Sequence, residues 1–257
     1  MDSQTADTLL ALNRRFYRTW AESFHRSRSH PWRGWTRLLQ HLPPEQRLTV
    51  LDVGCGNGRL ALFLRDAGLA FEYLGLDESE ELLRHAREQI PTDRRRQPDF
   101  QFQRFELFHD QDLSARVGRR FHFIGLFGVL HHLPGESRRL ELLRELSSLL
   151  LPGGLLSASA WRADQTEGFD RKVIPWDEWA AADRSGLGRA LDPTQLEPGD
   201  TLLGWQGHRH VPRYCHFPED AEILRWLQNL DLPLVDRYES DGRNGTDNLY
   251  LLWRRGS

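Results

Sequence analysis

The chain has 257 residues, of which 39% are hydrophobic and 28% are charged, and its formal net charge is −3. This composition is typical of a globular domain with a sizeable core, and no apolar segment is long enough to cross a bilayer. The negative charge gives no overall case for binding nucleic acid. The two cysteines, Cys55 and Cys215, do not make a disulfide framework, so we expect a cytoplasmic protein.

The N-terminal region is predicted to be helical, basic and aromatic. Residues 5–24 fit one helix, and a second is expected at about 32–42, before two prolines. The arginines here are Arg14, Arg15, Arg18, Arg26, Arg28, Arg33 and Arg37, and the aromatic residues are Phe16, Tyr17, Trp20, Phe24, Trp32 and Trp35. Such a set could bind phosphates and stack on bases. An amphipathic helix that packs its aromatic side chains inward explains most of them without a nucleic acid.

A regular alternation of strands and helices follows. Strands are predicted at 48–53, 71–76, 100–107, 121–130 and 155–161, with a terminal pair at 234–239 and 248–254. Helices are predicted at 58–67, 79–89, 136–151 and about 219–230. The pattern predicts an α/β fold, a doubly wound, Rossmann-like seven-stranded sheet with a reversed terminal strand pair.

The segment 162–217 is too long for a simple connection, and long insertions at this edge of a sheet usually cover a substrate site. We therefore expect two parts. Residues 1–46 form an N-terminal helical cap, and residues 47–257 form the main domain, whose insertion at about 162–217 completes a substrate cap.

The most informative motif is the run 48–58, in which a β-branched strand ends in Asp52 and opens into Gly54, Cys55, Gly56 and Gly58. A glycine-rich turn between a strand and a helix lets a ligand approach the backbone and the helix N-terminus. The next strand ends in Asp77, about 20 residues further on, where an acid can accept hydrogen bonds from ribose hydroxyls.

The spacing of these glycines is G-x-G-x-G, preceded by an acid, which differs from the dinucleotide fingerprint G-x-G-x-x-G. It resembles motif I of the class I S-adenosylmethionine-dependent methyltransferases, and the resemblance extends from residue 50 to residue 161. It implies S-adenosylmethionine as the cofactor. It further implies that Glu106 meets the adenine, with Leu107 beside the ring, although Asp110 offers a competing alignment.

The two ends of the chain are similar to the tRNA wobble-uridine carboxymethyl methyltransferases. The similarity lies in residues 16–32, in the pair of histidines His131 and His132, and in the run from Arg213 to His216. In that family the acceptor is a carboxymethyl group on a uridine of tRNA, and a small activating subunit generally takes part. This chain carries no clear signature for binding such a subunit.

Three functions therefore remain open: a methyltransferase acting on tRNA, a small-molecule (metabolite) methyltransferase, and a catalytically silent cofactor-binding subunit. A carboxylate acceptor needs no general base but calls for a guanidinium, and Arg26, Arg28 and Arg213 are the candidates. His131 would orient the acceptor, or take a proton from a hydroxyl or amine, unless it only holds its loop.

A metal site is not predicted. His208, His210, Cys215 and His216 lie close in sequence, but their spacing matches no paired-ligand signature. No membrane partner is expected either.

Overall fold

The computed structural model describes residues 1–28, 30–44, 47–90, 100–107, 113–162, 164 and 168–256. Its main feature is a seven-stranded sheet in the order β3-β2-β1-β4-β5-β10-β9. The strands are β1 (Leu48–Val53), β2 (Phe71–Asp77), β3 (Phe100–Arg104), β4 (Phe121–Leu126), β5 (Leu150–Trp161), β9 (Leu234–Ser240) and β10 (Asn248–Arg254). The first five pair in parallel, whereas β10 runs antiparallel to both β5 and β9, which confirms the predicted fold class.

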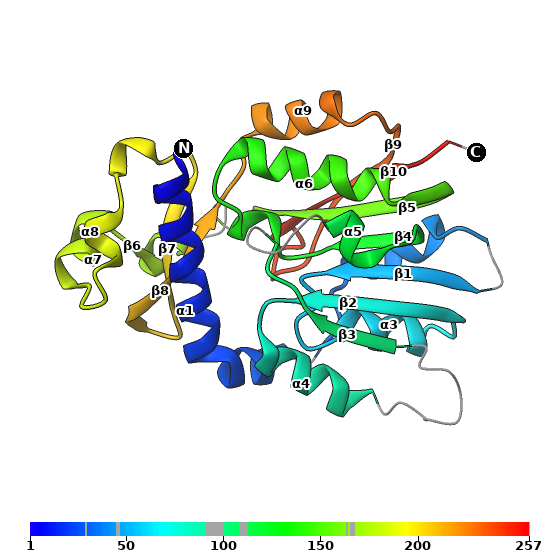
Figure 1. The fold of residues 1–257 in the computed structure, drawn as a ribbon, viewed down its shortest axis with the longest axis horizontal. Helices are drawn as coiled ribbons and strands as arrows, with labels where there is room; N and C mark the ends of the chain where they lie inside the picture. Colours follow the sequence, from blue (N-terminus) through cyan, green and yellow to red (C-terminus); the bar gives the residue numbers. More distant parts are fainter. Residues whose placement is uncertain are drawn as a thin grey trace.

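Helices cover both faces of this sheet (Figure 1). They are α2 (Gly34–Leu38), α3 (Arg59–Asp66), α4 (Glu80–Gln89), α5 (Leu113–Val117), α6 (Glu136–Ser148) and α9 (Asp220–Asn229). One hydrophobic core joins the sheet to α5, α6 and α9, and a second joins it to α2, α3 and α4. The central strand β4 is apolar along nearly all its length because it is covered on both faces.

The insertion after β5 forms a small antiparallel sheet with two short helices. Its elements are β6 (Val173–Ile174), α7 (Trp176–Ala182), α8 (Leu187–Ala190), β7 (Asp200–Trp205) and β8 (His208–His216). Helix α1 (Ser3–Ser27) packs on this sheet. Leu9 and Leu12 contact the core that contains Trp179 and Tyr214, and Phe16 packs against Trp205.

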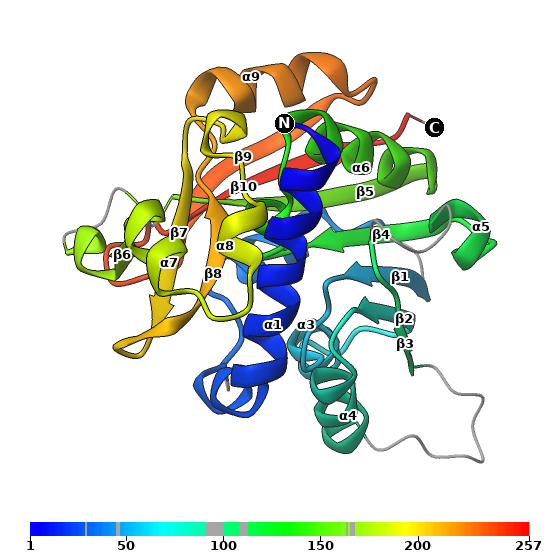
Figure 2. The same cartoon turned by 60° about the vertical axis from the view of Figure 1, so that its left-hand side comes forward.

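Helix α1 stands between the small sheet and the carboxyl ends of the parallel strands (Figures 1 and 2). This edge is where α/β sheets of this kind bind their ligands. Across the described residues, none of the helices combines the length and the apolar character that crossing a bilayer demands.

Candidate active site

The glycine-rich turn after β1 forms the floor of the site. Gly54, Gly56 and Gly58 all have positive φ angles, of 74°, 54° and 80°, a conformation that favours glycine. A Cβ atom on Gly54 would collide with the side chain of Val129, whereas one on Gly56 would meet nothing within 4 Å. The turn is therefore packed against Val129 at Gly54, whereas there is free space beside Gly56.

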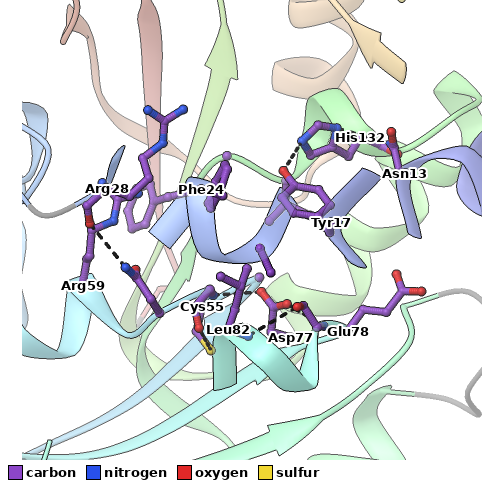
Figure 3. Close-up of a pocket in the computed structure, with 18 of the residues that line it drawn as sticks. Asn13, Tyr17, Phe24, Arg28, Cys55, Arg59, Asp77, Glu78, Leu82 and His132 are labelled. Atoms are coloured by element: carbon purple, nitrogen blue, oxygen red, sulfur yellow. Dashed lines mark hydrogen bonds between the residues drawn. The ribbon is translucent and has the colours of Figure 1, made fainter. Parts of the chain in front are cut away.

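Asp77, at the end of β2, holds this turn to the next strand. Its carboxylate accepts hydrogen bonds from the backbone N–H of Gly56 and that of Ser79, each at 2.8 Å. Burial raises the pKa of Asp77, and these backbone donors oppose the rise. A carboxylate offers about four lone-pair sites, so two accepted bonds leave room for ribose hydroxyls. Asp77 lines the main cavity, as does Cys55 (Figure 3).

Asp52 lies beneath the turn. It is buried, accepts a hydrogen bond from the Tyr73 hydroxyl and is not among the residues that line the cavity. Burial raises its pKa to about 7, against the lowering effect of the Tyr73 hydrogen bond. The structure thus places Asp52 where it supports the turn, while Gly54, Cys55, Gly56 and Asp77 line the cavity. Gly58 does not line it and instead faces Ala86 and Phe102.

The cavity has a volume of about 990 Å³ and lies between the glycine turn, the ends of β1, β2 and β4, helix α1 and the small sheet. Glu106 and Leu107 line its far end, where Glu106 pairs with Arg104. The competing residue, Asp110, lies outside the described residues. Glu78 lies at the same end, 3.6 Å from Arg14, and burial raises its pKa to about 7.

His131 also lines the cavity and is buried against aromatic side chains. Its ring stacks on Trp161 at 4.0 Å between ring centroids, and its Nδ1 has no hydrogen-bond partner among the described residues. Burial lowers the pKa of His131 well below 6.5, and neighbouring His132 and Arg213 lower it further. His131 is therefore a neutral side chain and a weak base.

His132 fastens helix α1 to the small sheet. Its Nε2 lies 2.7 Å from the Tyr17 hydroxyl, and its Nδ1 lies 3.0 Å from the carbonyl oxygen of Tyr214, which requires Nδ1 to carry the proton. Burial lowers the pKa of His132 to about 3 and raises that of Tyr17 to about 12. Asn13 joins this contact by accepting a hydrogen bond from the Tyr214 backbone.

Two of the three predicted arginines line the cavity. Arg213, on β8, is 7% exposed and lies over the rings of Trp161, Trp205 and Phe16, at 4.8 to 5.5 Å. Its Nε atom is buried and has no hydrogen-bond partner in the described part of the chain.

Arg28, at the end of α1, lies over Phe24 at 5.0 Å and over Trp205 at 5.9 Å. Arg26 instead points to solvent and pairs with Glu22. Arg28 and Arg59 lie on one side of the site, and Asp77 and Glu78 on the other (Figure 3).

Arg59 and Asn57 belong to the site but were not singled out from the sequence. Arg59 is the first residue of α3, lines the cavity and contacts Trp32 and Trp35. Burial, together with Arg28, lowers its pKa to about 10. The Asn57 amide donates to the carbonyl oxygen of Arg28 at 3.3 Å and lies 3.0 Å from His25 Nδ1. Asn57 lies within the glycine motif, and this position is the signal from which the sequence could have identified it as a site residue.

The histidines and cysteine considered for a metal are dispersed. His208 and His210 lie on the exposed hairpin beside Trp20, and His216 is bonded to two carboxylates. Cys215 lies near His131 and His132. Both nitrogens of His132 are already hydrogen-bonded, and burial raises the pKa of Cys215 to about 12, so this group is poorly suited to bind a cation.

Comparison with known proteins assigns the chain to a family. A family model described as a methyltransferase domain matches residues 24–236. The chain belongs to this family and is a class I S-adenosylmethionine-dependent methyltransferase. The open turn at Gly56 and the cavity-lining carboxylate of Asp77 suit this cofactor.

Two curated relatives differ in how much of the chain they match. One is a tRNA (carboxymethyluridine(34)-5-O)-methyltransferase of Mus musculus, 30% identical over 149 residues, which cover 58% of this chain and 20% of that protein. The chain thus spans a fifth of that relative's length. The other is a trans-aconitate 2-methyltransferase of Methylobacterium radiotolerans, 28% identical over 225 residues, 83% of this chain and 80% of that protein.

Among solved structures, an S-adenosylmethionine-dependent methyltransferase from Clostridium acetobutylicum is similar in fold. Its TM-score is 0.60 at 12% identity, and the match covers 95% of this chain and 99% of that one. This likeness confirms the fold alone.

Proposed function

We propose that this enzyme transfers the methyl group of S-adenosylmethionine to a carboxylate oxygen of a small organic acid. The observation that carries the proposal is Arg213, a buried guanidinium that lines the cavity with no carboxylate partner among the described residues. A buried, unpaired cation is costly, and a carboxylate is the group that its planar fork matches, so the substrate that enters this cavity is an organic acid.

The side chains near Arg213 also favour an acceptor that is already ionised. S-adenosylmethionine, when bound, supplies an electrophilic methyl group on a positively charged sulfur. A carboxylate attacks such a group without losing a proton, whereas a hydroxyl or amine needs a base. His131 and His132 are weak bases, because their pKa values are lowered, and the hydroxyl of Tyr17 keeps its proton. His131, whose Nδ1 has no hydrogen-bond partner among the described residues, orients the acceptor, while His132 and Tyr17 hold helix α1 in place.

A cavity-lining carboxyl group whose pKa burial raises to about 7 lies away from Arg28. Glu78 adjoins Asp77 and Arg14, and Figure 3 shows it on the side away from Arg28. It therefore stands beside the cofactor rather than beside the acceptor arginines, and it does not supply the missing base.

The N-terminal arginines favour a small acceptor over tRNA. Four of them pair with acids: Arg14 with Glu78, Arg15 with Asp183, Arg26 with Glu22 and Arg37 with Asp236. The aromatic residues among them pack against other rings of the protein. Trans-aconitate, the acceptor in the name of one relative, is itself a small carboxylic acid.

Methylation of a carboxymethyl group on tRNA is the second candidate. It is favoured by the relatives that carry this activity in their names, the first of which matches 58% of the chain. Its acceptor is also a carboxylate, so the same arginine would serve it. A small activating subunit would belong to this candidate. A catalytically silent subunit is the third candidate, and measurable turnover would rule it out.

The test uses purified protein, S-adenosylmethionine labelled in its methyl group, and two acceptor pools, total tRNA and a deproteinised metabolite extract. We expect label in the metabolite pool that is released by mild alkali, as a methyl ester requires. The Arg213→Gln variant should reduce this label strongly, and Arg26→Gln should not. Alkali-stable label would contradict carboxylate methylation, and label confined to tRNA would support the second candidate.

A further inference from the structure

The acceptor end of the cavity holds two arginines rather than one. Arg28 and Arg213 come from α1 and β8, and both guanidinium carbons lie within 6 Å of the centroid of the Trp205 ring. They are close enough to repel: burial lowers the pKa of Arg28, and the next cause is the charge of Arg213. Within the described ranges, no carboxylate forms an ion pair with either.

The walls around this pair are apolar. Arg213 lies over the rings of Phe16, Trp161 and Trp205, and the partly exposed Arg28 lies over those of Phe24 and Trp205. Such charge–ring contacts recover less free energy than a buried cation such as Arg213 loses on leaving water. An arrangement that keeps two such cations together therefore fits a bound anion.

The acidic group that the two arginines hold and the group that receives the methyl should be two different groups of the substrate. Two guanidiniums together present more N–H donors than one carboxylate has lone pairs. A carboxylate held between them has its lone pairs engaged, which makes it a good anchor and a poor nucleophile. The stacked rings of Trp161 and His131 lead from Arg213 toward the end of β4, where Val129 touches the glycine turn.

We propose that the acceptor carries at least two acidic groups, one anchored between Arg28 and Arg213, and a second, a carboxylate, that lies along Trp161 and His131 and receives the methyl group. This inference rests on the proposed function. A lone pair of the second carboxylate forms the new O–CH₃ bond while the S–CH₃ bond breaks, and its electron pair stays on sulfur. No proton moves, and the product is an ester that keeps one acidic group.

The retained charge can be measured directly. The enzyme is incubated with methyl-labelled S-adenosylmethionine and a metabolite extract from which macromolecules have been filtered, and the products are passed over an anion exchanger at pH 7. The ester of a diacid is still an anion and is retained, whereas the ester of a simple monoacid is neutral and flows through. We expect label that is both retained and released by mild alkali.

The other outcomes are distinct. Alkali-labile label in the flow-through would overturn the second acidic group and leave carboxylate methylation standing. Alkali-stable label, or none, would overturn the proposed function itself. Alkali-labile label found only when tRNA is supplied would overturn the small diacid while keeping a carboxylate acceptor.

A variant of Arg28 tests the anchor itself. In Arg28→Gln we expect the concentration of the retained acid fraction needed for half-maximal rate to rise about 10-fold or more, as loss of one charged hydrogen-bond partner implies. Affinity for S-adenosylhomocysteine should stay unchanged, and the matched control Arg26→Gln should behave as wild type.

The cofactor's own carboxylate is the competing ligand for Arg28. Calorimetry with S-adenosylhomocysteine and with 5′-methylthioadenosine, which lacks the amino-acid moiety, separates the two. If Arg28→Gln weakens binding of the first and not of the second, Arg28 holds the cofactor and the proposed anchor is wrong.

Discussion

Asp77 joins the glycine turn to the start of helix α4 through one carboxylate. Its oxygens hold the backbone of Gly56 in the glycine turn and that of Ser79, which is the N-cap of α4. The same group lines the cavity, so it shapes the turn and is the residue predicted to meet the ribose.

Replacing Asp77 with alanine should therefore remove more than a ligand contact. The variant loses the two charge-assisted hydrogen bonds to the Gly56 and Ser79 backbones, worth about 1.5 kcal/mol each, which hold the turn in place. We therefore expect S-adenosylhomocysteine to bind at least about 100-fold more weakly. Isothermal calorimetry measures this directly, with circular dichroism as a check that the variant is folded. Unchanged affinity in a folded variant would remove Asp77 from the cofactor site.

Gly54 and Gly68 provide a matched pair for the packing under the turn. Both have positive φ angles, of 74° and 79°, but only Gly54 faces a neighbour, the side chain of Val129. Gly54→Ala should cost the backbone strain plus about 1–3 kcal/mol of overpacking, whereas Gly68→Ala should cost the strain alone. Urea unfolding of both variants gives the difference. Equal stability would show that Val129 moves aside freely.

Between elements, the glycine turn and helix α1 are tied by Asn57. Its amide reaches the last turn of α1 at His25 and the carbonyl oxygen of Arg28. His25 in turn stacks on His85 of α4 at 3.9 Å between ring centroids. The position of Arg28 is thus set partly by the glycine turn.

We therefore expect Asn57→Ala to act on the acceptor through Arg28. The KM for the acceptor should rise several-fold, since a hydrogen-bond tether of about 1 kcal/mol is lost, while kcat changes less. Steady-state kinetics with the labelled acid fraction measure both constants. A fall in kcat at constant KM would show that Asn57 does not position Arg28 for binding.

A buried network fastens the small sheet to the main domain. His216 lies between Asp200 and Glu222, with 2.7 Å from each ring nitrogen to a carboxylate oxygen, which requires an imidazolium. Arg139 on α6 bonds to Glu222 and to Glu197, and the hydroxyl of Tyr214 bonds to Asp200. Elements β7, β8, α6 and α9 meet here.

This network predicts a loss of stability at alkaline pH. Burial lowers the pKa of His216, but the hydrogen bonds to Asp200 and Glu222 outweigh burial, and the net pKa is raised above 6.5. A raised folded-state pKa stabilises the protein fully below the unfolded value and ceases to do so as pH rises through the folded value.

Melting temperature should consequently fall from about pH 6.5 upward in the wild type, relative to a His216→Gln variant in which this slope is absent. Differential scanning calorimetry over that range, at constant ionic strength, checks it. Parallel slopes in the two proteins would show that His216 does not titrate in this window.

The regular elements could be predicted because their signals are local. Residues 48–53 form β1 as expected, since a β-branched run followed by glycines specifies a strand and its end. The helix predicted at 136–151 instead ends at Ser148, and β5 begins at Leu150. The Gly153 N–H there bonds to the carbonyl oxygens of Arg255 and Gly256, partners that only the folded chain supplies.

The site was partly predictable for the same reason. The residues predicted to bind the cofactor cluster in one motif, whereas the cavity also joins His131, Arg213 and residues of α1 that are distant in sequence. Asn13 shows the difficulty. It stands inside a helix with nothing local to mark it, yet its side chain bonds to the backbone of Tyr214.

For the molecule as a whole, the pairing of charges predicts weak binding to tRNA. With net charge −3 and most N-terminal arginines paired with acids, we expect only non-specific affinity, Kd of about 10⁻⁴–10⁻⁶ M at physiological salt. Filter binding measures this Kd at two salt concentrations that differ ~4-fold, about 50 and 200 mM, since phosphate contacts weaken as salt rises. Affinity in the nanomolar range would favour the tRNA candidate.

Helix α1 also has a consequence for how the chain is made. Its apolar residues Leu9, Leu12 and Phe16 are completely buried, and their partners, among them Trp205 and Tyr214, come near the end of the sequence. During synthesis the first helix emerges from the ribosome long before those partners exist. Until those partners are made, the apolar face of this helix is covered by chaperones or by transient contacts. The final docking of α1 is therefore a late and slow step of folding.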